Sequence, residues 1–135
     1  MNWVGLIGID IGTSGCKASL IDSRGRSIVE AASTYAPVYP REGWAEQDPD
    51  DWYQAAVSSV RKLLARPKAR QVEVAGIGVT GQMISAVFIG KDDRPIYPAI
   101  LWMDQRTSAE VEWLQEHEEE ISAITTVSYT HLTLP

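Results

Sequence analysis

An apolar segment that ends in an acid and a glycine-rich turn opens the chain. In LIGIDIGTSGCKASLID, Asp10 follows one apolar run, and Gly12 and Gly15 enclose two hydroxyl residues before the next run begins. Aspartate and closely spaced glycines both weaken a continuous strand. The stretch therefore predicts two strands joined by a short turn, with a carboxylate placed where the first strand ends.

The hydrophobic pattern of the whole chain predicts an α/β fold. The first apolar run, Val4–Ile9, is continuous enough to indicate a strand buried on both faces. Two more strands complete a three-stranded meander, with a tight turn around Gly25. A helix, two further strands and a second helix follow. The later elements are expected at residues 17–21, 27–33, 48–65, 72–80, 85–89 and 107–121.

The two expected helices carry recognisable start signals. Asp48 suits an N-cap, Pro49 suits the first helical position, and Pro67 ends the first helix. Thr107 and Glu110 have the spacing of a capping box at the start of the second helix. The apolar positions are Trp52, Ala56, Val60, Leu63 and Leu64 in the first helix and Val111, Leu114 and Ile121 in the second.

Composition narrows the class of protein. The 135 residues are 44% hydrophobic and 22% charged, as in an ordinary globular domain. A net charge of -6 without a basic cluster argues against a nucleic-acid partner. No apolar run reaches the roughly 20 residues that cross a membrane, and no signal peptide is recognisable. Cys16 is the only cysteine, which excludes a disulfide framework, so we expect a cytoplasmic protein.

The last nine residues continue none of these patterns. The string VSYTHLTLP, residues 127–135, resembles the translation of a transposon-end sequencing adapter. On this interpretation residues 1–126 belong to a partial N-terminal domain, and residues 127–135 are a non-native tail in which Tyr129 and His131 have no function. The alternative is a genuine strand-like segment.

The residues around the first turn suggest phosphate chemistry. Backbone amides and hydroxyls of Thr13, Ser14 and Gly15 can donate to phosphate oxygens, and Lys17 can add a positive charge. Asp10 can hold Mg²⁺, usually through water. The stretch matches neither G-x-x-x-x-G-K-[ST] nor G-x-G-x-x-G. From these residues alone, a plain hairpin turn remains an alternative.

Four motifs together resemble the FGGY family of carbohydrate kinases. DIGTSGCK, GWAEQDPDDWY, GIGVTGQM and PAILWMDQRT occur in the order and at the spacing found in the N-terminal part of that family's first domain, from Trp3 to about Ile121. The resemblance implies an actin-like ATPase (ribonuclease-H-like) fold. It also implies ATP and Mg²⁺ as cofactors, a small-molecule sugar as substrate, and two domains that close over both. A homodimer is left open for the full-length protein.

The resemblance assigns roles to individual residues. It makes Asp10 the metal-associated acid and turns Thr13, Ser14, Gly15 and Lys17 toward the ATP phosphates. The sugar would be contacted by Gln82, Met83, Ile84, Trp102, Asp104 and Arg106. Two alternatives stay open, that Trp102 is a core residue and that Arg106 only pairs with an acid.

Departures from the family pattern bear on the substrate. Glycerol kinases have Arg-Glu where this chain has Met83-Ile84, and xylulokinases usually have Met-His. We therefore expect a pentulose or hexose-type sugar and disfavour glycerol. The general base of the family lies beyond this chain, so the fragment alone is expected to be inactive. The competing hypotheses are a non-catalytic sugar-binding or regulatory module and an actin-like or chaperone-type ATPase.

Overall fold

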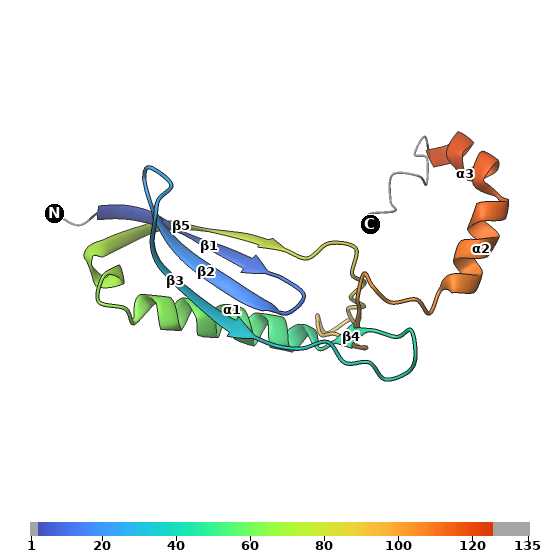
Figure 1. Cartoon of the computed structure of the whole chain (residues 1–135), viewed down its shortest axis with the longest axis horizontal. Coiled ribbons are helices and arrows are strands. Elements are labelled where there is room, and N and C mark those ends of the chain that lie inside the picture. Colours follow the sequence, from blue (N-terminus) through green and yellow to red (C-terminus); the bar gives the residue numbers. More distant parts are fainter. Residues whose placement is uncertain (1–2, 126–135) are drawn as a thin grey trace.

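The computed structural model describes residues 3–125 and contains a four-stranded sheet covered by one long helix (Figure 1). The strands of this sheet are β1 (Trp3–Ile11), β2 (Gly15–Asp22), β3 (Ser27–Thr34) and β5 (Val72–Gly81). Antiparallel pairing of β1 with β2 and of β2 with β3 confirms the expected meander, and β5 pairs in parallel with β1. In the resulting order, β3-β2-β1-β5, the carboxyl ends of β1 and β5 lie at the same edge.

Helix α1 (Pro49–Leu64) begins at the expected cap and ends before Pro67. The Asp48 carboxylate accepts the amide hydrogen of Asp50 at 2.9 Å. The buried face is rotated from the expected stripe, because the small residues Ala55 and Ser59 face the sheet and allow close packing on β2 and β3. Leu64, expected on the apolar stripe, is 43% exposed as a result.

One face of the sheet packs on α1 and the other is open. The core contains Ile7, Ala18 and Leu20 of the sheet, together with Leu63 of α1 and Ala69. On the opposite face, Leu6 is 49% exposed, and Gly8 and Asp10 are exposed as well. The expected burial of β1 on both faces is therefore wrong for residues 3–125, because no other element in this part of the chain covers the second face.

A small second sheet is formed by β4 (Glu46–Gln47) and β6 (Ala99–Ile100), which pair antiparallel. The strand expected at residues 85–89 is absent from the described structure, where this segment forms only isolated bridges from Ala86 to Ile100 and from Ile89 to Pro95. The facing segment contains Pro95 and Pro98, which lack the amide hydrogen that a continuous ladder needs. A 3-10 turn, η1 (Ala69–Gln71), precedes β5.

The final helix is divided at His117 into α2 (Ser108–Glu116) and α3 (Glu118–Thr125), which extend away from the sheet (Figure 1). Three glutamates fill the first turn of α3, where the helix dipole favours them, whereas the carboxyl end of α2 would disfavour them. Thr107 is the N-cap of α2 but its side chain makes no capping bond, so the expected capping box is wrong.

The structure bears on the expected membrane segments only for residues 3–125, and it does not describe the expected tail. Within residues 3–125, the helices are too short or too polar to cross a membrane. The expected non-native tail at residues 127–135 lies outside the described part of the chain.

Candidate functional site

The expected site residues gather where β1 and β5 end. Asp10 pairs in register with Thr80, and the amide of Gln82 donates to the carbonyl oxygen of Ile11 at 2.8 Å. The turn after β1 and the corner after β5 are therefore held side by side. Sheets with parallel strands place their ligands at such carboxyl ends.

The turn of residues 12–15, which we call the glycine turn, presents free backbone donors. Its ends are closed by the amide of Gly12, which donates to the carbonyl of Gly15 at 2.9 Å. The amides of Thr13 and Ser14 form no hydrogen bond with any residue from 3 to 125. Neighbouring free amides in a turn are suitable donors to an anion such as phosphate.

Gly15 has a second, structural reason to be glycine. A Cβ at this position would lie 2.7 Å from the carbonyl oxygen of Ser33, closer than real Cβ contacts allow. Any side chain would therefore force β2 away from β3. The glycine in the sequence motif is explained by strand packing, whether or not it also faces a ligand.

The carbonyl groups of the glycine turn are bonded to its neighbours. The Tyr35 hydroxyl donates to the carbonyl of Gly12 at 2.5 Å, and Gln47 Nε2 donates to the carbonyl of Thr13 at 2.7 Å. Burial raises the pKa of Tyr35 to about 12, which keeps the hydroxyl protonated and able to donate. The turn thus has bonded carbonyls, whereas its Thr13 and Ser14 amides have no partner among residues 3–125.

Asp10 and Lys17 line a shallow hollow of about 510 Å³ on the open face of the sheet. Gly8 and Gly78 also line it, and a Cβ at either glycine would meet no atom within 4 Å. The exposed Asp10 carboxylate forms no hydrogen bond or ion pair within the described chain. Lys17, opposite Asp10 in the strand pair, contacts Glu30 at 2.8 Å with both side chains about half exposed. Such a surface pair contributes little to stability, so the ammonium group can exchange partners.

Asp10 is suited to hold a divalent cation together with a ligand. Its oxygens are uncommitted, and Mg²⁺ is usually bound by one or two carboxylates with water and substrate phosphates. No cluster of three or more acidic, histidine or cysteine side chains occurs in the described part of the chain. A metal ion here would therefore depend on phosphate oxygens for further ligands.

The corner after β5 joins the glycine turn through side chains. Thr13 Oγ1 donates to Gln82 Oε1 at 3.2 Å, and Trp102 Nε1 donates to Thr13 Oγ1 at 3.2 Å. Met83, Ile84 and Trp102 are 73%, 66% and 56% exposed. The alternative that Trp102 is a core residue is therefore wrong for the described structure.

The backbone of this corner is strained. Ile84 has a φ of 60°, which is rare for a β-branched residue. Next to it, Ser85 Oγ is buried without a hydrogen-bond partner among the described residues. Strain and unpaired buried polar atoms concentrate at functional sites, which supports a role for this corner.

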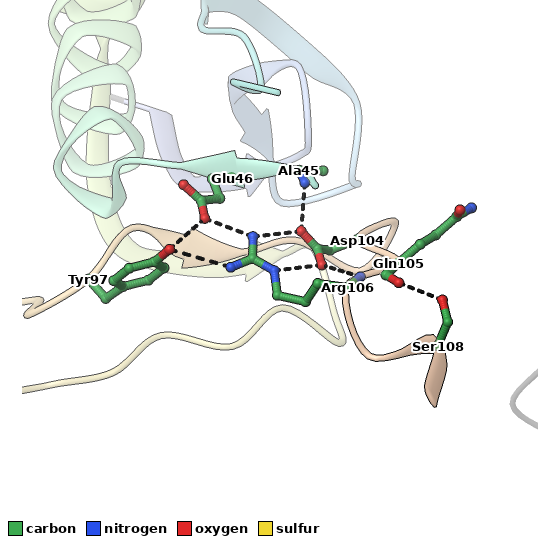
Figure 2. A network of polar contacts seen from close by, with 7 residues as sticks. All are labelled: Ala45, Glu46, Tyr97, Asp104, Gln105, Arg106 and Ser108. Carbon is green, nitrogen blue, oxygen red and sulfur yellow. Dashed lines mark hydrogen bonds and ion pairs between the residues drawn. The ribbon is translucent and has the colours of Figure 1, made fainter. Parts of the chain in front are cut away.

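Asp104 and Arg106, the last expected site residues, are bonded to each other (Figure 2). Arg106 Nε donates to Asp104 Oδ1 at 2.8 Å, and Arg106 Nη2 donates at 2.7 Å to both Asp104 Oδ2 and Glu46 Oε1. The hydroxyl of Tyr97 donates to the same Glu46 oxygen at 3.0 Å. We call these four residues, Glu46, Tyr97, Asp104 and Arg106, the clasp, because they join β4 to the segment around β6.

The charges of the clasp are buried and paired. The side chains of Arg106, Asp104 and Glu46 are 14%, 2% and 11% exposed, and the guanidinium lies 3.8 Å from the ring centre of Trp44. Hydrogen bonds from Arg106 and from the amide of Ala45 hold the pKa of Asp104 well below its ordinary value. Arg106 thus pairs with two acids, Asp104 and Glu46, as the alternative to a sugar contact expects.

Several residues that organise the site are not predicted from the sequence. They are Tyr35, Glu46, Gln47 and Tyr97. Glu46 and Gln47 lie in the motif GWAEQDPDDWY, but their partners are 60 and 34 positions away in the chain. Contacts over such separations leave no local pattern, so only the presence of the motif could have pointed to them.

Comparison with known proteins identifies relatives over most of the chain. Residues 5–133 match the FGGY family of carbohydrate kinases, N-terminal domain. The chain is 38% identical to a xylulose kinase from Staphylococcus xylosus, over 83% of this chain and 23% of that protein. It is 35% identical to a glycerol kinase from Allorhizobium ampelinum, over 89% of this chain and 24% of that protein. The chain thus spans about a quarter of the length of these relatives.

Structural comparison agrees with the sequence comparison. The crystal structure of a xyloylose kinase from Brucella ovis superposes with a TM-score of 0.81 at 37% identity, covering 90% of this chain and 25% of that one. The expected α/β fold of the actin-like ATPase class is confirmed. The chain belongs to the FGGY family of carbohydrate kinases.

Proposed function

We propose that this chain forms part of the active site of a kinase that transfers the γ-phosphoryl group of ATP to a hydroxyl of a pentulose or hexose-type sugar. The observation that carries this proposal is the direct hydrogen bond between Thr13 of the glycine turn and Gln82 of the corner. A turn with free amide donors and an exposed corner thus share one edge of the sheet. Phosphoryl transfer depends on such proximity, because the enzyme mainly aligns two reactants.

On the phosphate side, Thr13, Ser14 and Gly15 would face the ATP phosphates with their amides and hydroxyls. Lys17 would leave Glu30 and add its positive charge. Asp10 would hold Mg²⁺ through water at the exposed end of β1. When bound, the cation neutralises charge on the phosphate oxygens. Support for these roles comes from the amides of Thr13 and Ser14 and the carboxylate of Asp10, which form no hydrogen bond or ion pair among residues 3–125.

On the sugar side, Gln82, Met83, Ile84 and Trp102 would form the contact surface. Sugars present apolar C–H faces with a rim of hydroxyls, and this corner offers apolar side chains beside an amide. Asp104 and Arg106 would lie at the edge of the pocket. Because they are already bonded to each other and to Glu46, we assign them to holding the segment that carries Trp102.

The identity of the sugar would depend on Met83 and Ile84. The apolar Ile84 removes a hydrogen-bonding group from the position where xylulokinases usually have histidine. We therefore expect Ile84→His to shift preference toward xylulose, and we disfavour glycerol. A polar group that meets a matching sugar hydroxyl avoids an unsatisfied-bond penalty of roughly 1–3 kcal/mol.

The complete kinase, meaning the full-length protein that contains this segment, would supply the remaining groups. The general base and the adenine pocket would come from residues outside this chain, so we expect the 135-residue chain alone to be inactive. We further propose that residues 1–126 belong to the N-terminal domain, that residues 127–135 are non-native, and that the kinase works in the cytoplasm.

Sugar-dependent ADP formation by the complete kinase tests this function. The assay compares kcat/KM over pentuloses, hexoses, gluconate and polyols. We expect turnover with a pentulose or hexose-type sugar and little with glycerol. A protein that binds a sugar but forms no ADP would contradict the proposal and favour the non-catalytic sugar-binding alternative.

One variant separates the two sides of the site. Trp102→Ala should raise the KM for sugar by about tenfold or more, which corresponds to roughly 1.4 kcal/mol of lost contact, and leave the KM for ATP nearly unchanged. Trp102→Phe keeps an aromatic face and serves as the matched control. If Trp102→Ala weakens ATP and sugar equally, the sugar surface must lie elsewhere.

A further inference from the structure

Gln47 is a buried polar residue at the centre of the site, although no sequence pattern assigns it a role. It is 2% exposed and lies in β4. Its Nε2 donates to the carbonyl of Thr13 at 2.7 Å. Its Oε1 accepts from Trp52 Nε1 at 2.9 Å and from Gln82 Nε2 at 3.2 Å. One side chain thus bonds the glycine turn, helix α1 and the corner after β5.

The chemistry of two neighbours fixes the orientation of the Gln47 amide. The indole of Trp52 can only donate, so it must face the amide oxygen. The carbonyl of Thr13 can only accept, so it must face the amide nitrogen. A flipped amide would lose both hydrogen bonds, and Gln47 therefore has a single favourable arrangement.

These contacts close a ring of hydrogen bonds. Gln47 bonds the backbone of Thr13 and the side chain of Gln82, and Thr13 Oγ1 bonds Gln82 directly. A displacement of the glycine turn must therefore move the corner, or else break a bond in a buried place. A polar group that loses its hydrogen-bond partner in a buried network costs free energy.

We propose that Gln47 is a positioning residue that keeps the glycine turn aligned with the corner after β5. The inference rests on the proposed function, in which the turn faces the phosphates and the corner faces the sugar. Gln47 would touch neither reactant and would act through Thr13 and Gln82. Because a misplacement of about 1 Å can reduce turnover by about 100-fold, such a residue affects kcat without forming the binding surfaces.

The two residues of β4, Glu46 and Gln47, bond different clusters. Glu46 bonds Arg106 in the clasp, whereas Gln47 bonds Thr13 and Gln82. Successive side chains of a strand point to opposite sides, so one short strand reaches both clusters. Both residues of β4 are therefore bonded to other segments, and the clasp anchors the strand that carries Gln47.

The test replaces Gln47 with Met, which keeps the length of the side chain and removes its hydrogen bonds. In the complete kinase, we expect Gln47→Met to lower kcat by about 10- to 100-fold. The Kd of the sugar alone and of Mg-ATP alone, measured by calorimetry, should each change by less than about threefold. A loss confined to the Kd of one reactant would overturn the proposal, because it would indicate direct contact.

Ser59→Ala is the matched control for a merely structural role. Ser59 is 0% exposed, and its hydroxyl donates to the carbonyl of Cys16 at 3.2 Å, away from the ring. We expect it to lower the melting temperature and leave kcat within about threefold of the parent. If Ser59→Ala lowers kcat as much as Gln47→Met does, the proposal is overturned. The loss would then follow from removing any buried hydrogen bond, and not from the position of Gln47.

A milder variant decides the matter if Gln47→Met does not fold. Trp52→Phe keeps an aromatic ring but removes the indole N–H that bonds Gln47 Oε1, and we expect a kcat loss of about three- to tenfold with unchanged Kd values. Parental kcat in this variant would overturn the inference. An unmodified kinase that forms no ADP with any sugar would instead refute the proposed function.

Discussion

Two aspartates near one end of the sheet have opposite surroundings. Asp10 is exposed and forms no hydrogen bond or ion pair with residues 3–125, whereas Asp104 is 2% exposed and accepts hydrogen bonds from Arg106 and Ala45. A carboxylate that is already paired holds the chain together. One that is unpaired at a strand end is available to a ligand. The comparison of Asp10, beside the glycine turn, with Asp104, in the clasp, therefore distinguishes a carboxylate without a partner in the described chain from one that supports the fold.

The largest expected effect is on the stability provided by the clasp. Arg106→Leu would leave Asp104 and Glu46 buried and unpaired, so we expect unfolding free energy to fall by about 3–5 kcal/mol in urea titrations. Arg41→Leu is the control, since Arg41 lies over the same Trp44 ring at 4.7 Å without an acidic partner in the described chain. Arg41→Leu should lower the unfolding free energy by only about 0.5–1 kcal/mol. Equal losses would show that the ring contact, and not the ion pairs, supports the clasp.

The next effect is on turnover and tests the other side of the comparison. Asp10→Asn should lower kcat of the complete kinase by about 100-fold or more, because metal handling is weakened. The unfolding midpoint should not change, since the side chain has no partner to lose. Glu73→Gln removes a charge from an exposed residue of β5 and should have parental kcat. Near-parental turnover of Asp10→Asn at saturating Mg²⁺ would contradict the phosphate-binding role and favour the alternative that the glycine turn is a plain hairpin turn.

The acid response of the clasp is a smaller effect. Because the folded state lowers the pKa of Asp104, its ionised form contributes stability above the ordinary value of about 3.9, and this contribution is lost as the pH falls below that value. The unfolding free energies of the parent and of Asp104→Asn should therefore converge between about pH 5 and about pH 2. A difference that stays constant over this range would show that Asp104 is not held ionised by the fold.

The smallest effect concerns the strained corner. Ile84→Asn should raise the unfolding free energy by about 1 kcal/mol, because asparagine tolerates the left-handed backbone that isoleucine resists. Asp93 has a φ of 59°, and Asp93→Asn is the control that should change little. A lower stability for Ile84→Asn would mean that contacts of the isoleucine side chain outweigh the strain.

Local signals in the sequence predict the elements of the large sheet and helix α1. The apolar runs, the Asp48 cap and the turn at Gly25 act between near neighbours, so their patterns can be read directly. The pairing of β4 with β6 joins positions about 50 residues apart, and it leaves no such pattern. For residues 85–89 the local pattern is misleading. The apolar residues predict a strand, but the segment forms only isolated bridges because the facing segment contains prolines.

The candidate site divides in the same way. The strand end at Asp10 and the turn at residues 12–15 are visible in the sequence, because glycine and aspartate interrupt apolar runs. The bonds from Gln47 to Thr13 and from Arg106 to Glu46 depend on the tertiary fold. Whether an expected polar residue is free or already paired is therefore decided by the structure and not by the motif.

Amide hydrogen exchange of the complete kinase, measured with and without Mg-ATP and sugar, tests this distinction most directly. We predict slower exchange at residues 12–17 and 82–85, because the free amides of Thr13 and Ser14 would gain acceptors. Residues 45–47 and 104–106 should be unchanged, because the clasp is already bonded. Protection of the clasp without protection of the glycine turn would contradict the account.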